Sequence, residues 1–537
     1  MAKLVKRILK WTGLALGALV VLVGGVAGYL YSQKPKPIGK RPALQTELFT
    51  QPKVQLPVEE RFLYASAVEL AAKIRNKQAT SQEIVRAHIN AIKNNNFKTN
   101  AYVWLFEEEA MAAALAADAR VARGETVGLL HGVPVSVKEE FWVKGKPNTM
   151  NAEMFQGFTA PRNGDAVEAL LEQGAIILGT TNVPNMLADY QAIGDIYPTG
   201  NNPYDVRRTP GGSTGGGAAS VAAGMAPIAL GGDMGGSIRV PAAFNGIYGL
   251  KTTEGTIGSG AREFPGEPGN PKYRRMMVAG PLGRSVDDVE LAWNAVISKW
   301  PDRKRQMLEP KTTLADYSVA YFDEWRFRND RMFVGQDVKE QLASLAAALK
   351  AKKVAVHQDQ PAGFEEMMLM HRMLGAYLMF ENVPWLIRQF MIREFKKADS
   401  HRFQFGEALA RLGDLDPAEY DQLLRRRQEL ADRLETFFKK YDVLIMPVTP
   451  GPAIAHNPDH EAIKLDGHKI NYFDYFYYPL CFNVTGHPAL TIPMGLNRDG
   501  LPIALQVVGP LRSERRLLEF ARLIEPLHTG FVKPPKN

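Results

Sequence analysis

Short apolar runs alternate with helical patterns along the body of this chain, and that alternation limits the fold more than any other feature. The runs cover residues 133–137, 175–178, 443–446, 489–492 and 503–508. Elsewhere apolar residues recur at three- and four-residue spacings, as in residues 62–74, and Thr80 with Glu83 predicts the start of a helix through residue 92. Buried strands separated by helices are typical of an α/β fold.

Residues 11–31 contain no charge and are dominated by Leu, Val, Ala and Gly. A membrane-spanning helix needs about 20 such residues. A cleaved secretory signal usually has a shorter apolar region and a small-x-small site, whereas this segment ends in Gly28-Tyr29-Leu30-Tyr31. We therefore predict an uncleaved, single-pass membrane anchor over 11–31, with a cleaved signal as the alternative.

Basic residues flank this segment on both sides. The flank at residues 1–10 contains Lys3, Lys6, Arg7 and Lys10, and such a flank normally stays in the cytoplasm. That orientation would place the folded body on the non-cytoplasmic side, although Lys34, Lys36, Lys40 and Arg41 oppose it. Residues 32–60 are rich in Pro and Lys and predict a linker or extended arm. By length alone, residues 61–530 could form one very large domain or two to three ordinary ones.

The charge and cysteine content exclude several classes of protein. The formal net charge of +8 equals the eight basic residues within positions 1–41, so the rest of the chain is neutral overall. A nucleic-acid-binding body would carry its own basic excess, so we expect no nucleic-acid partner. Cys481 is the single cysteine, and no Cys/His group has zinc-ligand spacing, so we expect no disulfide and no metal.

Two glycine-dense segments, 209–217 and 231–239, are the strongest candidates for a functional site. Neither contains the Lys of a phosphate-binding loop nor the strand–GxGxxG–helix context of a dinucleotide fold. Gly211-Gly212-Ser213-Thr214-Gly215 matches the GxSxG nucleophile elbow, but residues 201–208 before it are polar rather than strand-like. The elbow alternative would also need His487 or His528 as its base.

Residues 211–253, GGSTGGGAASVAAGMAPIALGGDMGGSIRVPAAFNGIYGLKTT, closely resemble the signature of the amidase signature family. Further matches follow in family order over roughly residues 62–526. They are Leu130-His131-Gly132-Val133-Pro134-Val135-Ser136-Val137-Lys138, Asp165-Ala166, Gly174-Ala175-Ile176-Ile177-Leu178-Gly179-Thr180-Thr181-Asn182, Asn202-Pro203-Tyr204-Asp205, Gly280-Pro281-Leu282, Asp442-Val443-Leu444-Ile445-Met446-Pro447, Asn483-Val484-Thr485-Gly486-His487-Pro488 and Gly500-Leu501-Pro502.

The resemblance implies a single domain with a mixed central sheet flanked by helices, and a Ser-Ser-Lys triad without a cofactor. By resemblance, Ser237 is the nucleophile, Ser213 is a bridging serine after a cis peptide bond, and Lys138 is the base. The backbone N–H groups of Met234, Gly235, Gly236 and Ser237 would form the oxyanion hole. The departures from the family pattern, Glu139, Thr180 and Thr252, leave these positions intact.

The triad makes a physical demand on Lys138. Lysine acts as a base at neutral pH only if burial lowers its pKa from about 10.4 toward neutrality, at a cost of roughly 4 kcal/mol. The apolar run 133–137 beside Lys138 provides such surroundings. Asp233 and Arg239 flank the second glycine segment, and we expect them to form a buried pair that fixes the shape of the loop.

The resemblance implies an amidase that cuts a small-molecule carboxylic amide into an acid and an amine or ammonia through an acyl-enzyme. Residues 367–397 contain six Met together with aromatic and basic residues, which is consistent with a hydrophobic cap that admits lipophilic or aryl amides, or with an ordinary helical pair that covers the site. The alternatives are a catalytically silent membrane scaffold and an amidotransferase subunit. The residues leave a homodimer open.

Overall fold

The structure, a computed structural model, describes residues 39–257, 276–327, 330–380, 408 and 417–535. Eleven strands form one sheet through the middle of the molecule, in the order β1-β3-β2-β4-β6-β5-β14-β15-β11-β7-β10. In chain order these strands are β1 Tyr102–Leu105, β2 Pro134–Lys138, β3 Ile176–Thr181, β4 Ile228–Asp233, β5 Tyr248–Lys251, β6 Val278–Gly283, β7 Ser318–Tyr321, β10 Ala355–Gln358, β11 Val443–Pro447, β14 Ala489–Leu496 and β15 Pro502–Val508.

The sheet is mixed. β2 runs parallel to both β3 and β4, and β7 runs parallel to β10 and β11. The strands between these parallel groups pair in antiparallel fashion, from β4–β6 through β14–β15 to β11. The α/β class and the mixed central sheet are therefore confirmed, and each of the five apolar runs in the sequence lies largely within a strand.

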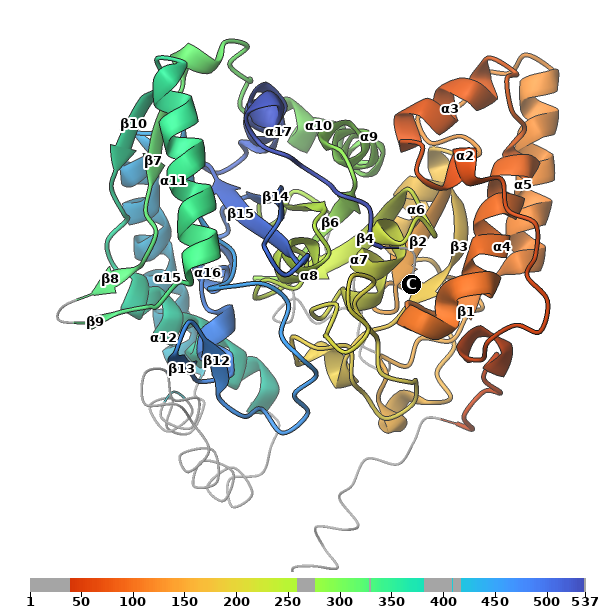
Figure 1. The fold of residues 1–537 in the computed structure, drawn as a ribbon, viewed down its shortest axis with the longest axis horizontal. Coiled ribbons are helices and arrows are strands. Elements are labelled where there is room, and N and C mark those ends of the chain that lie inside the picture. Colours follow the sequence, from red (N-terminus) through yellow and green to blue (C-terminus); the bar gives the residue numbers. More distant parts are fainter. Residues whose placement is uncertain (1–38, 258–275, 328–329, 381–407, 409–416, 536–537) are drawn as a thin grey trace, which may run out of the picture.

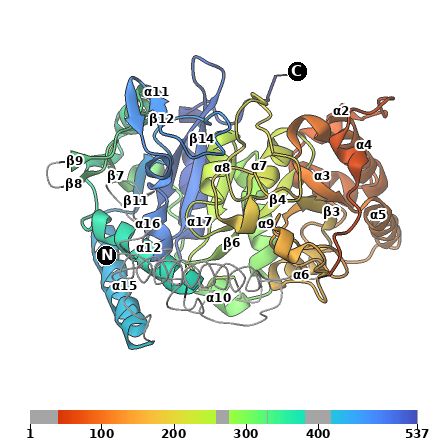
Figure 2. The same cartoon turned by 90° about the horizontal axis from the view of Figure 1, so that it is seen from below.

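Helices flank the sheet along its length. The longer ones are α3 Ala67–Arg75, α4 Ser81–Thr99, α5 Glu107–Ala122, α6 Asp165–Glu172, α7 Gly215–Ala222, α9 Val286–Ile297, α11 Gln336–Ala351, α12 Phe364–Phe380, α15 Pro417–Phe438 and α17 Glu514–Ile524. Figures 1 and 2 show α4 and α5 at the β1 end of the molecule and α11, α12 and α15 at the opposite end. Shorter helices are α2 Glu60–Leu63, α8 Arg239–Phe244, α10 Pro301–Arg305 and α16 Leu480–Val484, and short hairpins pair β8 Arg326–Phe327 with β9 Asp330–Arg331 and β12 Ile463–Leu465 with β13 His468–Ile470.

The predicted start of α4 is confirmed, because Thr80 and Glu83 form a reciprocal capping box. The helix continues to Thr99, beyond the expected residue 92. The prediction for residues 62–74 was wrong in detail. The Ser66 side chain accepts a hydrogen bond from the Glu69 N–H and so starts a new helix, which splits the segment into α2 and α3. Val68, one of the periodic apolar residues, is 40% exposed.

The arm ahead of the domain lies along its surface in residues 39–59. Gln45 exchanges hydrogen bonds with the backbone of Leu105, and Asn94 does the same with the backbone of Leu56. No helix among the described residues is long and apolar enough to cross a membrane. The expected anchor at 11–31 lies outside the described residues.

The expected cap at 367–397 is described only as far as residue 380. In that part, Met367, Met368 and Met370 are buried in the largest apolar core together with residues of β11, β15 and α17. Those methionines therefore serve as core packing. Residues 381–397 lie outside the described part of the chain.

Candidate active site

The candidate site lies where two parallel strands end. Lys138 is the last residue of β2 and Asp233 is the last residue of β4, its direct neighbour in the sheet. Because parallel strands end at the same edge, this register brings the lysine to the loop that follows β4. The sequence has its glycine-rich segment 231–239 at this loop, so two motifs that lie about a hundred positions apart meet here.

Lys138 is completely buried and surrounded by acceptors. Its Nζ lies 2.9 Å from Ser213 Oγ and 3.2 Å from the carbonyl oxygen of Gly232. A third oxygen, Glu140 Oε2, lies 2.5 Å from the same nitrogen. The lysine thus hydrogen-bonds to Ser213 and Gly232, and Glu140 makes an ion-pair contact with it.

Ser213 lies in the turn that leads into α7, and the peptide bond between Gly212 and Ser213 is cis, as the resemblance implied. Glycine is needed at 212 because a Cβ atom there would come within 2.5 Å of the Asp189 carbonyl oxygen. Thr214, not Ser213, is the N-cap residue of α7, and its hydroxyl donates to the Gly232 carbonyl. The Ser213 side chain therefore faces Lys138 and does not cap the helix.

Ser237 lies in the turn between β4 and α8, and a backbone bond joins it to the other serine loop. The Thr214 N–H donates to the Ser237 carbonyl oxygen at 3.1 Å. Unlike Lys138 and Ser213, Ser237 is partly exposed. The structure thus gathers Lys138, Ser213 and Ser237, with the predicted nucleophile as the accessible member.

The predicted oxyanion donors differ in how they are engaged. The carbonyl of Met234 accepts from His371 Nε2 at 3.0 Å, and that of Gly235 accepts from the Tyr190 hydroxyl at 2.8 Å. Because the N–H and C=O of one peptide point in opposite directions, these bonds orient the next amide in each case. The Gly236 N–H donates to Asp233 Oδ1 at 2.8 Å and is therefore occupied, which leaves Gly235 as the better oriented donor.

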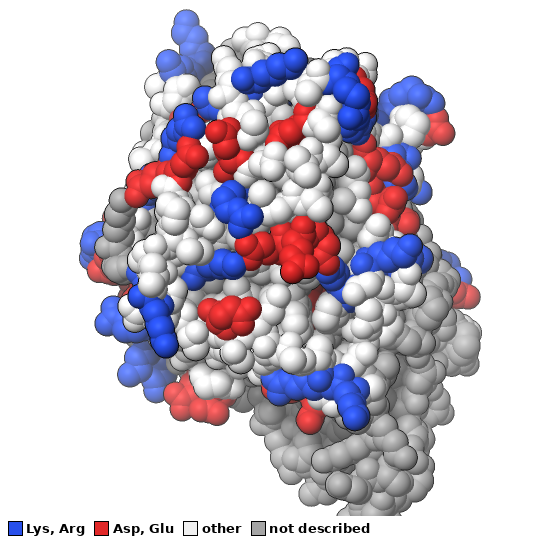
Figure 3. Space-filling model, turned by 90° about the vertical axis from the view of Figure 1, so that its right-hand side faces the viewer, with Lys and Arg blue, Asp and Glu red and all other residues white. Residues whose placement is uncertain are grey.

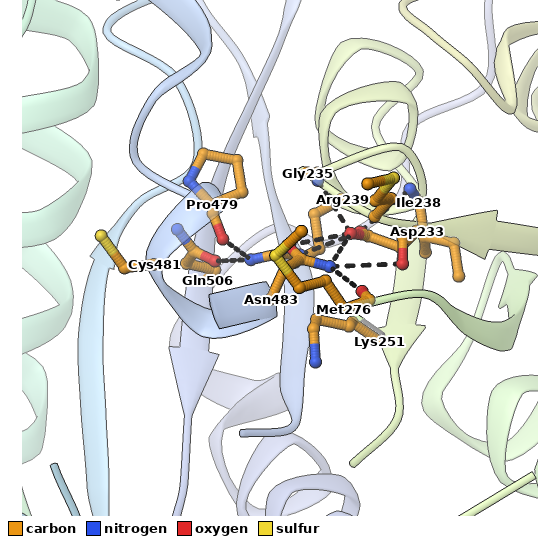
Figure 4. A network of polar contacts seen from close by, with 12 residues as sticks. Asp233, Gly235, Ile238, Arg239, Lys251, Met276, Pro479, Cys481, Asn483 and Gln506 are labelled. Carbon is orange, nitrogen blue, oxygen red and sulfur yellow. Dashed lines mark hydrogen bonds and ion pairs between the residues drawn. The ribbon is translucent and has the colours of Figure 1, made fainter. Parts of the chain in front are cut away.

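Asp233 and Arg239 form the expected buried pair (Figure 4). The guanidinium donates all five of its N–H bonds, to both Asp233 carboxylate oxygens, Asn483, Pro479 and Gln506. Asp233 also accepts from the amides of Gly236 and Ile238. Despite burial, Arg239 and these donors hold the pKa of Asp233 well below its usual range.

Sequence reasoning missed Glu140. Its side chain is 2% exposed and Lys138 is 0% exposed, so the two form a fully buried pair. Strand spacing gave no signal for it, because β2 ends at Lys138 and Glu140 lies in the following turn, where its N–H donates to the Lys138 carbonyl at 2.6 Å. The adjacent Glu139 faces other partners, Tyr197 and Thr149, and burial raises its pKa to about 7.

The GxSxG alternative does not fit this geometry. No strand precedes Ser213 between residues 201 and 212, where the chain forms only an isolated bridge at Arg208. His487 Nε2 lies 2.9 Å from Glu435, and burial lowers its pKa. The basic side chain recorded in contact with Ser213 is therefore Lys138, while His487 is bound to Glu435.

Fold and site together define an α/β enzyme of amide chemistry, built around paired serine loops and a buried lysine. The chain belongs to the amidase signature family, because the amidase family model matches residues 83–518.

Individual relatives cover nearly the whole domain. The chain is 28% identical over 510 residues to the A subunit of glutamyl-tRNA(Gln) amidotransferase from Clostridium botulinum (strain Eklund 17B / Type B), covering 86% of this chain and 96% of that protein. A solved amidase superimposes with a TM-score of 0.70 at 26% identity, over 87% of this chain and 100% of its own. A fatty acid amide hydrolase shares the fold, with a TM-score of 0.71, 21% identity and coverage of 89% and 87%.

Proposed function

We propose that the protein is an amidase that hydrolyses a carboxylic amide through an acyl-enzyme on Ser237. The observation that supports this most is the 2.9 Å contact between Lys138 Nζ and Ser213 Oγ, both of which are buried. Lysine is the group that can take a proton, and Ser213 stands between it and the loop of Ser237.

In this mechanism Ser237 Oγ attacks the amide carbonyl as its proton passes to Ser213, whose own proton passes to Lys138. The oxyanion is held by backbone N–H groups of the 234–237 loop, with Gly235 oriented by its neighbours. Lysine then returns the proton through Ser213 to the leaving amine. Water attacks the acyl-enzyme by the same relay and releases the acid.

A fluorophosphonate probe tests the nucleophile. Wild-type protein should label covalently at Ser237, and Ser237→Ala should not label. Labelling at Ser213 that persists in Ser237→Ala would instead favour the elbow alternative. Absence of labelling in folded wild-type protein would favour a silent scaffold.

We infer that the substrate is a lipophilic or aryl amide. Apolar atoms of Leu480, Pro479 and Val240 pack against the 234–237 loop, together with two polar atoms, His371 Nε2 and the Tyr190 hydroxyl. Tyr190 in turn stacks on Phe476 with ring centroids 4.2 Å apart. Turnover of p-nitroanilides of graded acyl length should rise with chain length, and a preference for acetamide would contradict this.

We also propose that the 11–31 segment anchors the enzyme in a membrane, with the domain on the non-cytoplasmic side. The support is the charge-free composition of that segment and the basic flank before it. Full-length protein should sediment with membranes and resist alkaline extraction, and external protease should reach the domain. Release by carbonate, or cleavage by signal peptidase, would contradict the anchor.

A second candidate function is amide transfer, because the curated relatives are amidotransferase subunits. In that case glutamine would be the amide donor, and an aminoacyl-tRNA and further polypeptides would be required. On the face formed by α4 and α5, acidic and basic side chains are interspersed (Figure 3) and include pairs such as Arg86–Glu107. Hydrolysis of an anilide by the isolated chain, without glutaminase activity, would decide for the amidase.

A further inference from the structure

Glu140 is a feature of the site that the triad alone does not use. Its carboxylate oxygen lies 2.5 Å from Lys138 Nζ, and both side chains are shielded from water, at 2% and 0% exposure. A carboxylate so close to an ammonium favours the charged form of the lysine. Lys138 can act as a base only in its neutral form. The contact with Glu140 therefore hinders catalysis unless a group nearby accepts the proton that the ammonium must lose.

The geometry offers such an acceptor. We propose that Glu140 is the internal proton acceptor that converts Lys138 from ammonium to free amine, so that no proton has to leave for solvent. This inference rests on the proposed function above. Glu140 acts through Lys138 and is therefore a positioning residue rather than a catalytic one.

The step balances in atoms and charge. A proton moves across the 2.5 Å contact from Lys138 Nζ to Glu140 Oε2, so that one N–H bond breaks, the O–H bond of a carboxylic acid forms, and both groups become neutral. Rotation about Cε–Nζ then aims the amine lone pair at the Ser213 hydroxyl, while one N–H bond stays on the Gly232 carbonyl. When Ser213 delivers its proton the lysine becomes ammonium again, and the return of that proton to the leaving amine resets the pair.

The other ionisable groups nearby are committed elsewhere. Glu139 accepts from the Tyr197 hydroxyl at 2.6 Å and from the Thr149 amide at 3.0 Å. Asp233, which follows Gly232 on β4, is bound by the Arg239 guanidinium at 3.0 Å. Of these three carboxyl groups, Glu140 is the one in contact with Lys138 Nζ.

The test measures the second-order rate of fluorophosphonate labelling of full-length protein in detergent between pH 6 and 9.5. This readout reports activation of Ser237 and needs no identified substrate. Wild-type labelling should stay nearly flat across neutral pH, because the lysine is discharged internally. Glu140→Gln should label at least about tenfold more slowly at pH 7 and recover by about tenfold per pH unit, because its lysine must lose a proton to solvent.

Two further variants make the outcome specific. Glu140→Asp retains a carboxylate and should keep a flat profile, so it decides the matter if Glu140→Gln does not fold. Glu139→Gln alters the neighbouring buried carboxyl and should keep the wild-type profile. Thermal melts of each variant establish that the fold is intact.

Opposite results would overturn the inference. If Glu140 were only a counter-ion, its removal would favour neutral lysine, and Glu140→Gln would label as fast as wild type or faster at pH 7. A wild-type profile that rises by about tenfold per pH unit through neutrality would also overturn it. Labelling that persists in Ser237→Ala or Lys138→Ala would refute the proposed function itself. That result differs from one in which only Glu140→Gln behaves unexpectedly, which would refute the role of Glu140 alone.

Discussion

Two buried ion pairs lie at neighbouring strand ends in this protein, and they differ in what their cations can do. Asp233–Arg239 is closed, since the guanidinium donates all five of its N–H bonds to buried acceptors. Lys138–Glu140 contains an amine that can lose a proton, next to the Ser213 hydroxyl. The Asp233–Arg239 pair therefore fixes the loop in one conformation, whereas the Lys138–Glu140 pair allows proton transfer.

The largest expected effect comes from removing the nucleophile while leaving both pairs intact. Ser237→Ala should lower kcat by on the order of 10⁵- to 10⁶-fold with no change in melting temperature, because only the attacking oxygen is lost. Ser220→Ala is a matched control, since that buried hydroxyl donates to Gly217 within α7 and not to the triad. If wild type and Ser237→Ala were equally active, Ser237 would not be the nucleophile. The proton-transfer role that distinguishes Lys138–Glu140 from Asp233–Arg239 would then have no basis.

Breaking the closed pair should cost stability. In Arg239→Met, Asp233 would remain buried among amide donors that require its ionised form, so the free energy of unfolding should fall by about 3–5 kcal/mol. Lys138→Met should abolish labelling but destabilise less, because Glu140 can take up a proton and become neutral. Urea unfolding followed by circular dichroism measures both, and a larger loss of stability in Lys138→Met would invert the comparison.

A third buried carboxyl, Glu139, sharpens the comparison because its hydrogen-bond partners are two hydroxyls and one backbone amide rather than a cation. Burial raises its pKa from 4.5 to about 7, so the folded state binds the proton more tightly than the unfolded state. Its contribution to stability is present below pH 4.5 and is lost as the pH rises through 7, by on the order of 3 kcal/mol. The stability of Glu139→Gln relative to wild type should increase over this window, and a constant difference would contradict the assignment.

The smallest expected effect concerns His371, which contacts the Met234 carbonyl in the 234–237 loop. His371→Phe keeps a ring but removes the donor to the Met234 carbonyl, so the Gly235 amide should be less well oriented. The loss is about 1 kcal/mol, and kcat should fall by roughly five- to tenfold with little change in KM. A fall in affinity without a fall in kcat would indicate that His371 contacts substrate instead.

Much of the fold could be predicted from local patterns, and part could not. Strands β2, β3, β11, β14 and β15 are rich in apolar residues and buried along nearly their whole length, as in a sheet covered on both faces. Strands β4 and β6 contain glycine where neighbours approach closely, as at Gly280, and their apolar signal is correspondingly weak. The order of the strands depends on long-range pairing that no local pattern encodes.

The site shows the same division. The meeting of Lys138 with the serine loops and the Asp233–Arg239 pair could be expected from the motifs, and the catalytic roles of Lys138, Ser213 and Ser237 stay predictions. Glu140 and the partners of the 234–237 loop could not be expected, because Tyr190 and His371 come from separate segments and meet the loop only in the folded chain. The occupied Gly236 amide likewise follows from the tertiary arrangement of Asp233.

The anchoring of Arg239 has a consequence for biosynthesis. Its last three acceptors come from Pro479, Asn483 and Gln506, more than 200 residues after the loop that it supports (Figure 4). While the ribosome is still making the middle of the chain, the glycine loop lacks these contacts and Asp233–Arg239 is only partly enclosed. A nascent chain should therefore acquire a reactive Ser237 only after residues 479–506 have left the ribosome and can bind Arg239.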